Sequence, residues 1–432
     1  MYDIYVRIFT DIVSGGNYMK KERRKLLLVM LLCIAMIGTT LLSACSQPDP
    51  EEPPAPAANP LTGATADQGY DEASAERRIA AFVVENAPDA RPQWGMDDEN
   101  YSPDIILQAE VEGGITRTLW FYADYEKLPE IIGPTRSARP PFIKFSELFD
   151  SIFIHWGMSH SKGEYVGAKT VFKHDGVDHI DQMSLDDQEG MYGRDTTRAV
   201  NVEHRGIIYG EKVPATIKNE GIRTKPKEYT KFNFNRIAEP VSETPATQVG
   251  VKFSNRAFED IYWTYNEEDG MYHCSNFEND LKRDNLLVLS SKTEYITKEG
   301  YEGPGSAGSV TYCDYYLRGG DAKLFSKGTV KDIKWQIVDG KLELIDPSTD
   351  AETAQAANDE NLAAAKETVK ADENAEWPVY NKYVIVTPEP EEGEELSEEE
   401  ALANSYVIQN LNAGKTWIGW ISSNNGGKVS SN

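Results

Sequence analysis

An apolar run near the N-terminus, residues 26–42, decides which part of this chain can fold as a globular protein. It follows Met19 and the basic stretch 20–25, and a basic region followed by an apolar one is typical of a secretory signal. Residues 1–18 lie upstream of the basic stretch and do not share its character, so we expect translation to start at Met19. The sequence therefore predicts a signal segment over residues 1–44 and a mature chain that folds outside the cytoplasm.

The apolar run ends in Leu42-Ser43-Ala44-Cys45, which resembles the lipobox of bacterial lipoproteins. In that motif the cysteine becomes the first residue after cleavage and carries a diacylglyceryl group. The alternative is an uncleaved anchor, because a run of this length approaches what spans a bilayer. The position of Cys45 favours lipidation. We thus expect a protein of the cell envelope that is held at the cell membrane by a lipid and faces outside the cytoplasm.

The net charge, the cysteine count and the length of the chain exclude some classes of protein. The 432 residues contain 44 Lys+Arg against 70 Asp+Glu, a net charge of -26. A protein that binds nucleic acid needs a basic footprint, so we expect no nucleic-acid partner. Four cysteines are too few for a disulfide-stapled scaffold, and the length suggests two to three domains.

Composition shifts along the chain predict an α+β protein, with a mixed α/β N-terminal domain followed by a smaller β-rich C-terminal domain. A Pro-rich acidic stretch predicts a disordered tether, and a Glu-rich stretch with an Ala-rich helix predicts an insertion. The expected boundaries are a tether over 45–70, a first domain over 71–210, a linker over 211–248, a second domain over 249–422 with the insertion at 346–403, and a tail over 423–432.

Alternating residues around Gly113-Gly114 predict a β-hairpin with a two-residue turn. Counting back from that turn places Glu110 across from Arg117, on the same face as Glu112. One interpretation is a structural ion pair on a hairpin. The other is a carboxylate that grips a ligand or acts as a general base.

A second group of candidates precedes a predicted helix. Pro140 and Pro141 suit the first turn of a helix, because their missing N–H groups have no partner there. Arg136, Ser137 and Arg139 would then surround the start of that helix, a plausible site for a carboxylate or phosphate. The alternative is that both arginines pair with acids such as Glu110, Glu112 or Glu85, and we expect Arg139 to be the more exposed of the two.

Other candidates follow a short buried strand. Ser151 to Ile154 leads into His155, and in sheets with helical crossovers ligands gather where strands end. His155 is therefore a candidate, with a hydrogen-bonded structural histidine as the alternative. Arg194 and Asp195 are polar candidates in a turn-like region that also fits a solvated loop.

No metal or cofactor is predicted. The run 174–181 contains His, Asp and Gly residues, but its two histidines lie at a spacing that suits no zinc signature. Common catalytic motifs, such as H-E-x-x-H, the P-loop and G-x-S-x-G, are absent from the sequence. Cys274 and Cys313 lie in predicted strands, and an exported chain permits either a disulfide between them or free thiols.

Several segments of this sequence are characteristic of a known family. They are residues 85–93, 111–117 and 132–140, the string His155-x-Gly157-x-Ser159 and, more weakly, residues 284–289, 328–330 and 412–418. These segments resemble the YerB-like bacterial lipoproteins, a family of unknown function. The resemblance implies an α/β N-terminal domain, a β-rich C-terminal domain and a lipid anchor. It implies no reaction.

Two functions are therefore open. The first is a non-enzymatic binding module of the envelope, whose polar residues grip an anionic ligand or an envelope protein. The second is a hydrolase of an anionic envelope polymer, with Glu112 or His155 as the general base. The absence of catalytic motifs favours the first.

Overall fold

The computed structural model describes residues 50–299, 308–372, 374–390 and 396–432. The predicted signal segment and Cys45 lie outside these residues. Residues 54–365 and 377–432 form one compact unit, which carries every site discussed below. In the described ranges, no helix combines the length and the apolar character that crossing a bilayer requires.

Most helices of the described residues are short. The α-helices are α3 (Glu72–Ala75), α4 (Pro140–Glu147), α5 (Ala168–Asp175), α6 (Val213–Asn219), α7 (Ala351–Ala371) and α8 (Glu398–Ala403). The long α7 is the Ala-rich helix expected within the insertion, and its end, from residue 366 onward, is not part of the compact unit.

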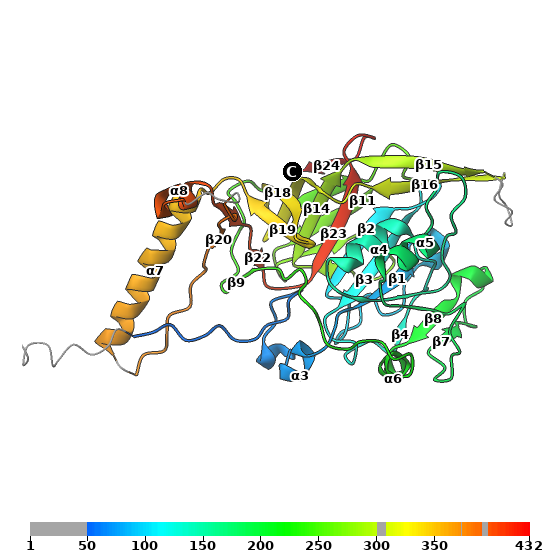
Figure 1. The fold of residues 1–432 in the computed structure, drawn as a ribbon, viewed down its shortest axis with the longest axis horizontal. Coiled ribbons are helices and arrows are strands. Elements are labelled where there is room, and N and C mark those ends of the chain that lie inside the picture. The colour runs from blue at the N-terminus through cyan, green and yellow to red at the C-terminus, as the bar shows by residue number, and fades with distance from the viewer. Residues whose placement is uncertain (1–49, 300–307, 373, 391–395) are drawn as a thin grey trace, which may run out of the picture. The chain divides into compact units, whose positions relative to one another are not determined.

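A twelve-stranded mixed sheet organises the compact unit (Figure 1), in the order β20-β21-β19-β18-β17-β14-β23-β2-β3-β1-β5-β6. Its strands are β1 (Ala80–Glu85), β2 (Ile105–Glu110), β3 (Thr116–Tyr122), β5 (Ile152–His155), β6 (His179–Asp181), β14 (Asn285–Ser291), β17 (Gly319–Ser326), β18 (Thr329–Val338), β19 (Lys341–Asp346), β20 (Val384–Val386), β21 (Tyr406–Ile408) and β23 (Thr416–Ser422).

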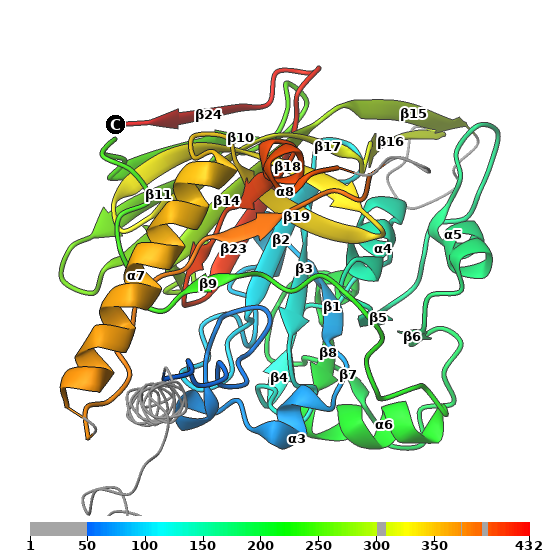
Figure 2. The ribbon, with the colours of Figure 1, turned by 60° about the vertical axis from the view of Figure 1, so that its left-hand side comes forward.

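Strand direction gives this sheet two distinct edges. β14, β23 and β2 are parallel neighbours, and so are β1, β5 and β6. β3 lies between β2 and β1 and runs antiparallel to both. Six strands in the row from β14 to β6 (Figure 2) therefore run in the same direction, with their carboxyl ends at one edge and their amino ends at the other.

The central strands are buried on both faces, which explains their nearly continuous apolar sequences. In β2, Ile105 and Leu107 pack into one core while Ile106 packs into the other. Three consecutive apolar residues, Ile105 to Leu107, are therefore all buried, because the two faces of β2 face different cores. In β23, Trp420 and Trp417 divide between the two cores in the same way.

Different elements cover the two faces. Helices α4 and α5 supply Phe142, Phe145 and Phe172 to the first core. The second core is completed by α6 and by a separate five-stranded sheet with Val249 and Trp263. That sheet contains β13 (Lys282–Arg283), β12 (Met271–Cys274), β11 (Ile261–Asn266), β10 (Gln248–Lys252) and β24 (Lys428–Ser431).

The remaining strands form three small sheets. They are β4 (Ile131–Ile132), β8 (Gly206–Tyr209) and β7 (Tyr192–Arg194) in one, β15 (Thr293–Glu299) with β16 (Ser309–Tyr315) in the next, and β9 (Phe234–Asn235) with β22 (Leu411–Asn412) in the last.

The α+β class, with a mixed first half and a β-rich second half, is confirmed. The halves are joined more closely than the sequence suggests, because β23 lies between β14 and β2 in one sheet. The expected linker contains α6 and β9, and the expected tail contributes β24 to a sheet. The expected tether already contains the buried residues Leu61 and Tyr70, since these side chains pack into the first core.

Candidate functional site

Three polar side chains end three neighbouring parallel strands. Glu85 is the last residue of β1, His155 of β5 and Asp181 of β6. All three residues are buried. The carboxyl edge of parallel strands is where ligands gather in α/β sheets, so the strand ends point to this edge first.

The segment before α4 fills the space where β1 and β5 diverge. β1 and β5 pair only from Ala80 to Phe82 on the β1 side. Beyond that point, the backbone N–H of Arg136 donates to the carbonyl of Val83 at 3.1 Å, and the N–H of Trp156 donates to the carbonyl of Arg136 at 3.1 Å. This strand-like insertion brings Arg136 and Ser137 to the carboxyl edge.

Helix α4 begins at Pro140, with Pro141 in its first turn, as predicted. The preceding Arg139 is already paired within the protein. Its guanidinium donates two hydrogen bonds to the Glu112 carboxylate, Nε to Oε2 at 2.8 Å and Nη2 to Oε1 at 2.5 Å. Arg117 contacts the same carboxylate at 3.1 Å and donates to the carbonyl of Ser137 at 2.7 Å. We call Glu112, Arg117 and Arg139 the Glu112 cluster.

Electrostatics make the Glu112 cluster an internal ion-pair network. Burial alone would raise the pKa of Glu112, but the charges and hydrogen bonds of Arg117 and Arg139 outweigh it and lower the pKa to about 2. Burial lowers the pKa of Arg117 to about 10. The Arg139 side chain is 11% exposed and that of Arg136 25%, so the expectation that Arg139 is the more exposed is wrong.

The hairpin is confirmed, but its register differs by one residue from the prediction. Ala109, not Glu110, lies opposite Arg117, and Glu110 lies opposite Thr116. The Glu110 carboxylate instead accepts a hydrogen bond from the hydroxyl of Tyr295 at 2.9 Å. The predicted pair between Glu110 and Arg117 is therefore absent from the sheet.

A one-residue bulge beside the turn explains the shift. The N–H of Ile115 donates to the carbonyl of Glu112 at 3.0 Å, which closes the expected two-residue turn. The N–H of Val111 also bonds across the hairpin, to the carbonyl of Ile115 at 2.9 Å. Val111 and Glu112 thus both face Ile115, and the extra residue moves every later pair by one.

Arg136 is paired as well, though more loosely. Its Nε lies 3.1 Å from Glu85 without hydrogen-bond geometry, and its Nη2 lies 3.3 Å from Glu203. The other oxygen of Glu85 contacts Nδ1 of His204 at 2.9 Å. The alternative in which both arginines pair with Glu112 and Glu85 is therefore the one found.

His155 is fully buried and joins a short hydrogen-bond chain. Its Nδ1 lies 2.7 Å from the carbonyl of Gly157, which can only accept, so Nδ1 carries the proton. Its Nε2 then accepts from Nδ1 of His179 at 3.0 Å. Burial lowers the pKa of His155 to about 4 and also lowers the pKa of His179, so both rings are neutral at pH 7. This chain leaves Nε2 of His179 unprotonated.

A pocket of about 870 Å³ opens at this edge, within the 300–1,000 Å³ range of ligand sites. We call it the carboxyl-edge pocket. Trp156 and Phe172 supply apolar wall, and the guanidinium carbon of Arg194 lies 4.3 Å from the centre of the Trp156 ring. The charged residues lining it are the bases Arg136, Lys169, Lys173 and Arg194 and the acids Asp181 and Glu203.

The structure brings only some of the predicted candidates together. Arg136, Ser137 and Arg194 line the carboxyl-edge pocket, and His155 lies behind His179. Asp195 does not line it, and its carboxylate caps the turn at Thr197, with Oδ1 accepting from the Thr197 N–H at 2.8 Å. The predicted candidates Glu110, Glu112, Arg117 and Arg139 do not line it either.

Sequence reasoning missed Lys169, Lys173 and His179 as pocket residues. His179 was considered only as a metal ligand, although it begins a short strand beside His155. The lysines carry no sequence signal of their own, because their role depends on which face of α5 borders the pocket.

Cys274 and Cys313 are free thiols, so the unbridged alternative holds. Cys274 lies in β12 of the five-stranded sheet, whereas Cys313 lies in β16 of a separate two-stranded sheet.

Residues 61–223 match the N-terminal domain of DUF3048, a family of proteins of unknown function. The chain is also 26% identical over 324 residues to a Bacillus subtilis (strain 168) protein named "Putative lipoprotein YerB", an alignment that covers 72% of this chain and 88% of that protein. Both comparisons support the resemblance of this chain to the YerB-like lipoproteins. The crystal structure of YerB from Bacillus subtilis matches with a TM-score of 0.58 at 20% identity, covering 87% of this chain and all of that one, and so shares the fold.

Proposed function

We propose that this YerB-like chain is a lipid-anchored protein of the cell envelope whose carboxyl-edge pocket binds an anionic ligand without converting it. Relation to a protein named as a lipoprotein supports the anchor. The ligand's charge is inferred from the pocket, and the anchor from Cys45.

The observation that carries the proposal is the excess of positive charge in this pocket. Four bases and two acids line it, a local balance of +2, on a chain whose net charge is -26. Lys169 and Lys173 are exposed and have no ion pair among the described residues. Cations without counter-ions around a cavity favour a carboxylate or a phosphate group.

The hydrolase alternative has less support. A general base must reach the proton that it removes and must be basic near the working pH. Glu112 lies outside the pocket, and its lowered pKa makes it a weak base. His155 is fully buried, and both of its ring nitrogens are already hydrogen-bonded.

Calorimetric titration of the full chain in detergent with inorganic phosphate and with citrate tests the proposal. We expect at least one of the two to bind, and the double variant Lys169→Ala/Lys173→Ala to bind it about tenfold more weakly, since two exposed charge contacts are worth about 0.7 kcal/mol each. Added salt should weaken binding further.

The matched control is Lys218→Ala/Lys227→Ala, which removes the same charge from two exposed lysines outside the pocket. An equal loss of affinity in both double variants would show a nonspecific charge effect and overturn the proposal. So would the failure of both anions to bind.

A further inference from the structure

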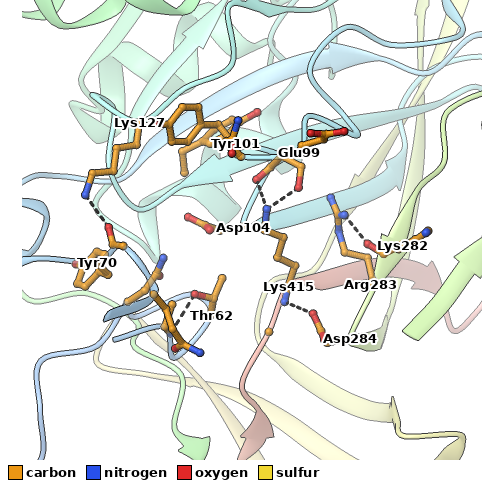
Figure 3. Close-up of a pocket in the computed structure, with 18 of the residues that line it drawn as sticks. Thr62, Tyr70, Glu99, Tyr101, Asp104, Lys127, Lys282, Arg283, Asp284 and Lys415 are labelled. Atoms are coloured by element: carbon orange, nitrogen blue, oxygen red, sulfur yellow. Dashed lines mark hydrogen bonds between the residues drawn. The ribbon is translucent and has the colours of Figure 1, made fainter. Parts of the chain in front are cut away.

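A second pocket, of about 720 Å³, lies at the opposite edge of the same sheet. It borders the amino ends of β2, β23 and β14, and Figure 3 shows 18 of the residues that line it. We call it the amino-edge pocket. None of the candidates predicted from the sequence lies in it.

Strand register places three charged residues side by side in this pocket. Thr416 pairs with both Ile105 and Asn285, so the residues just before these strands, Asp104, Lys415 and Asp284, form a row of alternating charge. Lys415 donates from its backbone N–H to Asp284 at 2.7 Å and from Nζ to the carbonyl of Ser102 at 2.9 Å.

Gly414 makes this arrangement possible. Its φ is +141°, and a Cβ at this position would lie 2.2 Å from Cγ of Asp284. Only glycine lets the chain pass this close to the Asp284 side chain while Lys415 makes its backbone bond. The row of charges is therefore held in place before any ligand arrives.

The central charges of this pocket lack close ion pairs within the described ranges. Asp104, Asp284, Arg283 and Lys415 form no ion pair with any residue that the structure describes. Arg283 is only 2% exposed, and its Nε has no hydrogen-bond partner there. Buried charges are normally paired, so an unpaired group of this kind at a cavity points to a missing partner.

The pKa values of these four groups show that burial disfavours their charged forms. Burial, followed by the neighbouring charge of Arg283, lowers the pKa of Lys415 to about 8. Burial lowers the pKa of Arg283 to about 10, and it raises the pKa of Asp104 and that of Asp284. An opposite charge bound beside each group would shift its pKa back toward the ordinary value.

The unpaired charges are of both signs. Six acids and four bases line the pocket, and two pairs neutralise each other, Lys127–Asp124 at 3.8 Å and Lys282–Asp280 at 3.1 Å. The remaining groups are Asp97, Glu99, Asp104, Asp284, Arg283 and Lys415. A simple anion would meet four acids here, and a simple cation would meet the two bases.

We propose that the amino-edge pocket binds a small zwitterion, an amino acid or the end of a short peptide, with its carboxylate near Arg283 and Lys415 and its ammonium group near Asp104 and Glu99. The site does not depend on the function proposed for the carboxyl-edge pocket. Inside the described ranges, no cluster of three or more His, Cys, Asp or Glu side chains has metal-binding geometry, so a metal ion is not the ligand favoured by these acids.

Calorimetric titration of the full chain in detergent tests this proposal with each of the twenty L-amino acids and with Ala-Ala. Acetate and ethylammonium chloride, at matched ionic strength, present each charge alone. We expect at least one zwitterion to bind at least tenfold more tightly than either single-charge probe, because each charged partner adds a charge-assisted hydrogen bond.

Lys415→Met and Arg283→Met should each weaken zwitterion binding about tenfold or more. Lys334→Met, at an exposed lysine of β18, is the control and should bind like the parent. Thermal melts of each variant identify any that fails to fold, and Lys415→Met decides the matter if Arg283→Met does not fold. Binding of acetate as tight as that of the best zwitterion, unchanged affinity in the folded variants, or no binding by any zwitterion would overturn the proposal.

Discussion

Removing Arg139 should destabilise the protein much more than removing a comparable surface cation. In the folded state two of its nitrogens contact Glu112, whose side chain is 18% exposed, and Arg117 holds the same carboxylate at 3.1 Å. Breaking a buried ion pair costs about 3–5 kcal/mol. Because Glu112 keeps Arg117, we expect Arg139→Ala to cost about 3 kcal/mol, the lower end of that range.

The pKa of Glu112 gives the same magnitude. It falls from 4.5 to about 2 on folding, which corresponds to about 3 kcal/mol of preference for the charged form. Since the folded pKa is the lower one, this stabilisation is fully present above pH 4.5 and is lost as the pH falls toward 2. The difference in stability between the parent and Arg139→Ala should therefore shrink over the same pH window.

Thermal melts and urea titrations at pH 7 and at several values between 4.5 and 2 measure this. We expect the melting temperature of Arg139→Ala to fall by about 6 °C at pH 7. Lys144→Ala is the control on the same helix, because Lys144 and its partner Asp314 are 35% and 29% exposed and such a pair is worth less than about 1 kcal/mol. Equal losses in the two variants would refute the assignment of the Glu112 cluster as a structural network.

Three further outcomes are expected. Gly114→Ala should destabilise the hairpin by more than about 2 kcal/mol, because φ is +85° and a Cβ would lie 2.2 Å from a backbone carbonyl oxygen. Gly113→Ala is the control and should cost only about 1–2 kcal/mol, because a Cβ there would meet open space. Chemical denaturation of the two variants measures the difference. His155→Gln should flatten the pH dependence of stability between pH 6.5 and pH 4. The neutral buried imidazole stabilises the fold above pH 6.5, and this stabilisation is lost as the pH falls toward 4. An unchanged slope of unfolding free energy against pH, measured by denaturation at several pH values, would contradict the prediction. Cys45→Ala should leave the protein in the medium or as uncleaved precursor, and membrane retention with a cleaved signal, seen by fractionation, would rule out lipidation.

Local rules predict much of this fold from the sequence. The glycine turn at 113–114 and the start of α4 at Pro140 follow from backbone preferences of single residues, and both are confirmed. The register of the hairpin does not follow, because Glu112 also bridges to Tyr312 of β16, two hundred residues later. A long-range contact of this kind leaves no signal in the alternation of the hairpin itself.

The candidate sites also combine features that the local sequence predicts with features that depend on long-range contacts. His155 is predicted at a strand end by a local pattern, but its burial and its contact with His179 depend on β6 lying beside β5. The amino-edge pocket escapes prediction altogether, because Asp104 and Lys415 are over three hundred residues apart and meet only through the register of β2 and β23. Residue type and spacing cannot identify such a site.

The two pockets lie at opposite ends of strands that run in one direction, and their charge balances are opposite as well. A six-residue strand such as β1 spans about 20 Å, roughly twice the distance over which physiological salt screens a charge. The acids of the amino-edge pocket therefore do not cancel the +2 balance at the carboxyl edge, so the two pockets can favour different ligands. For the same reason, substitutions in the two pockets should change ligand affinity independently, since sites this far apart that share no partner act additively.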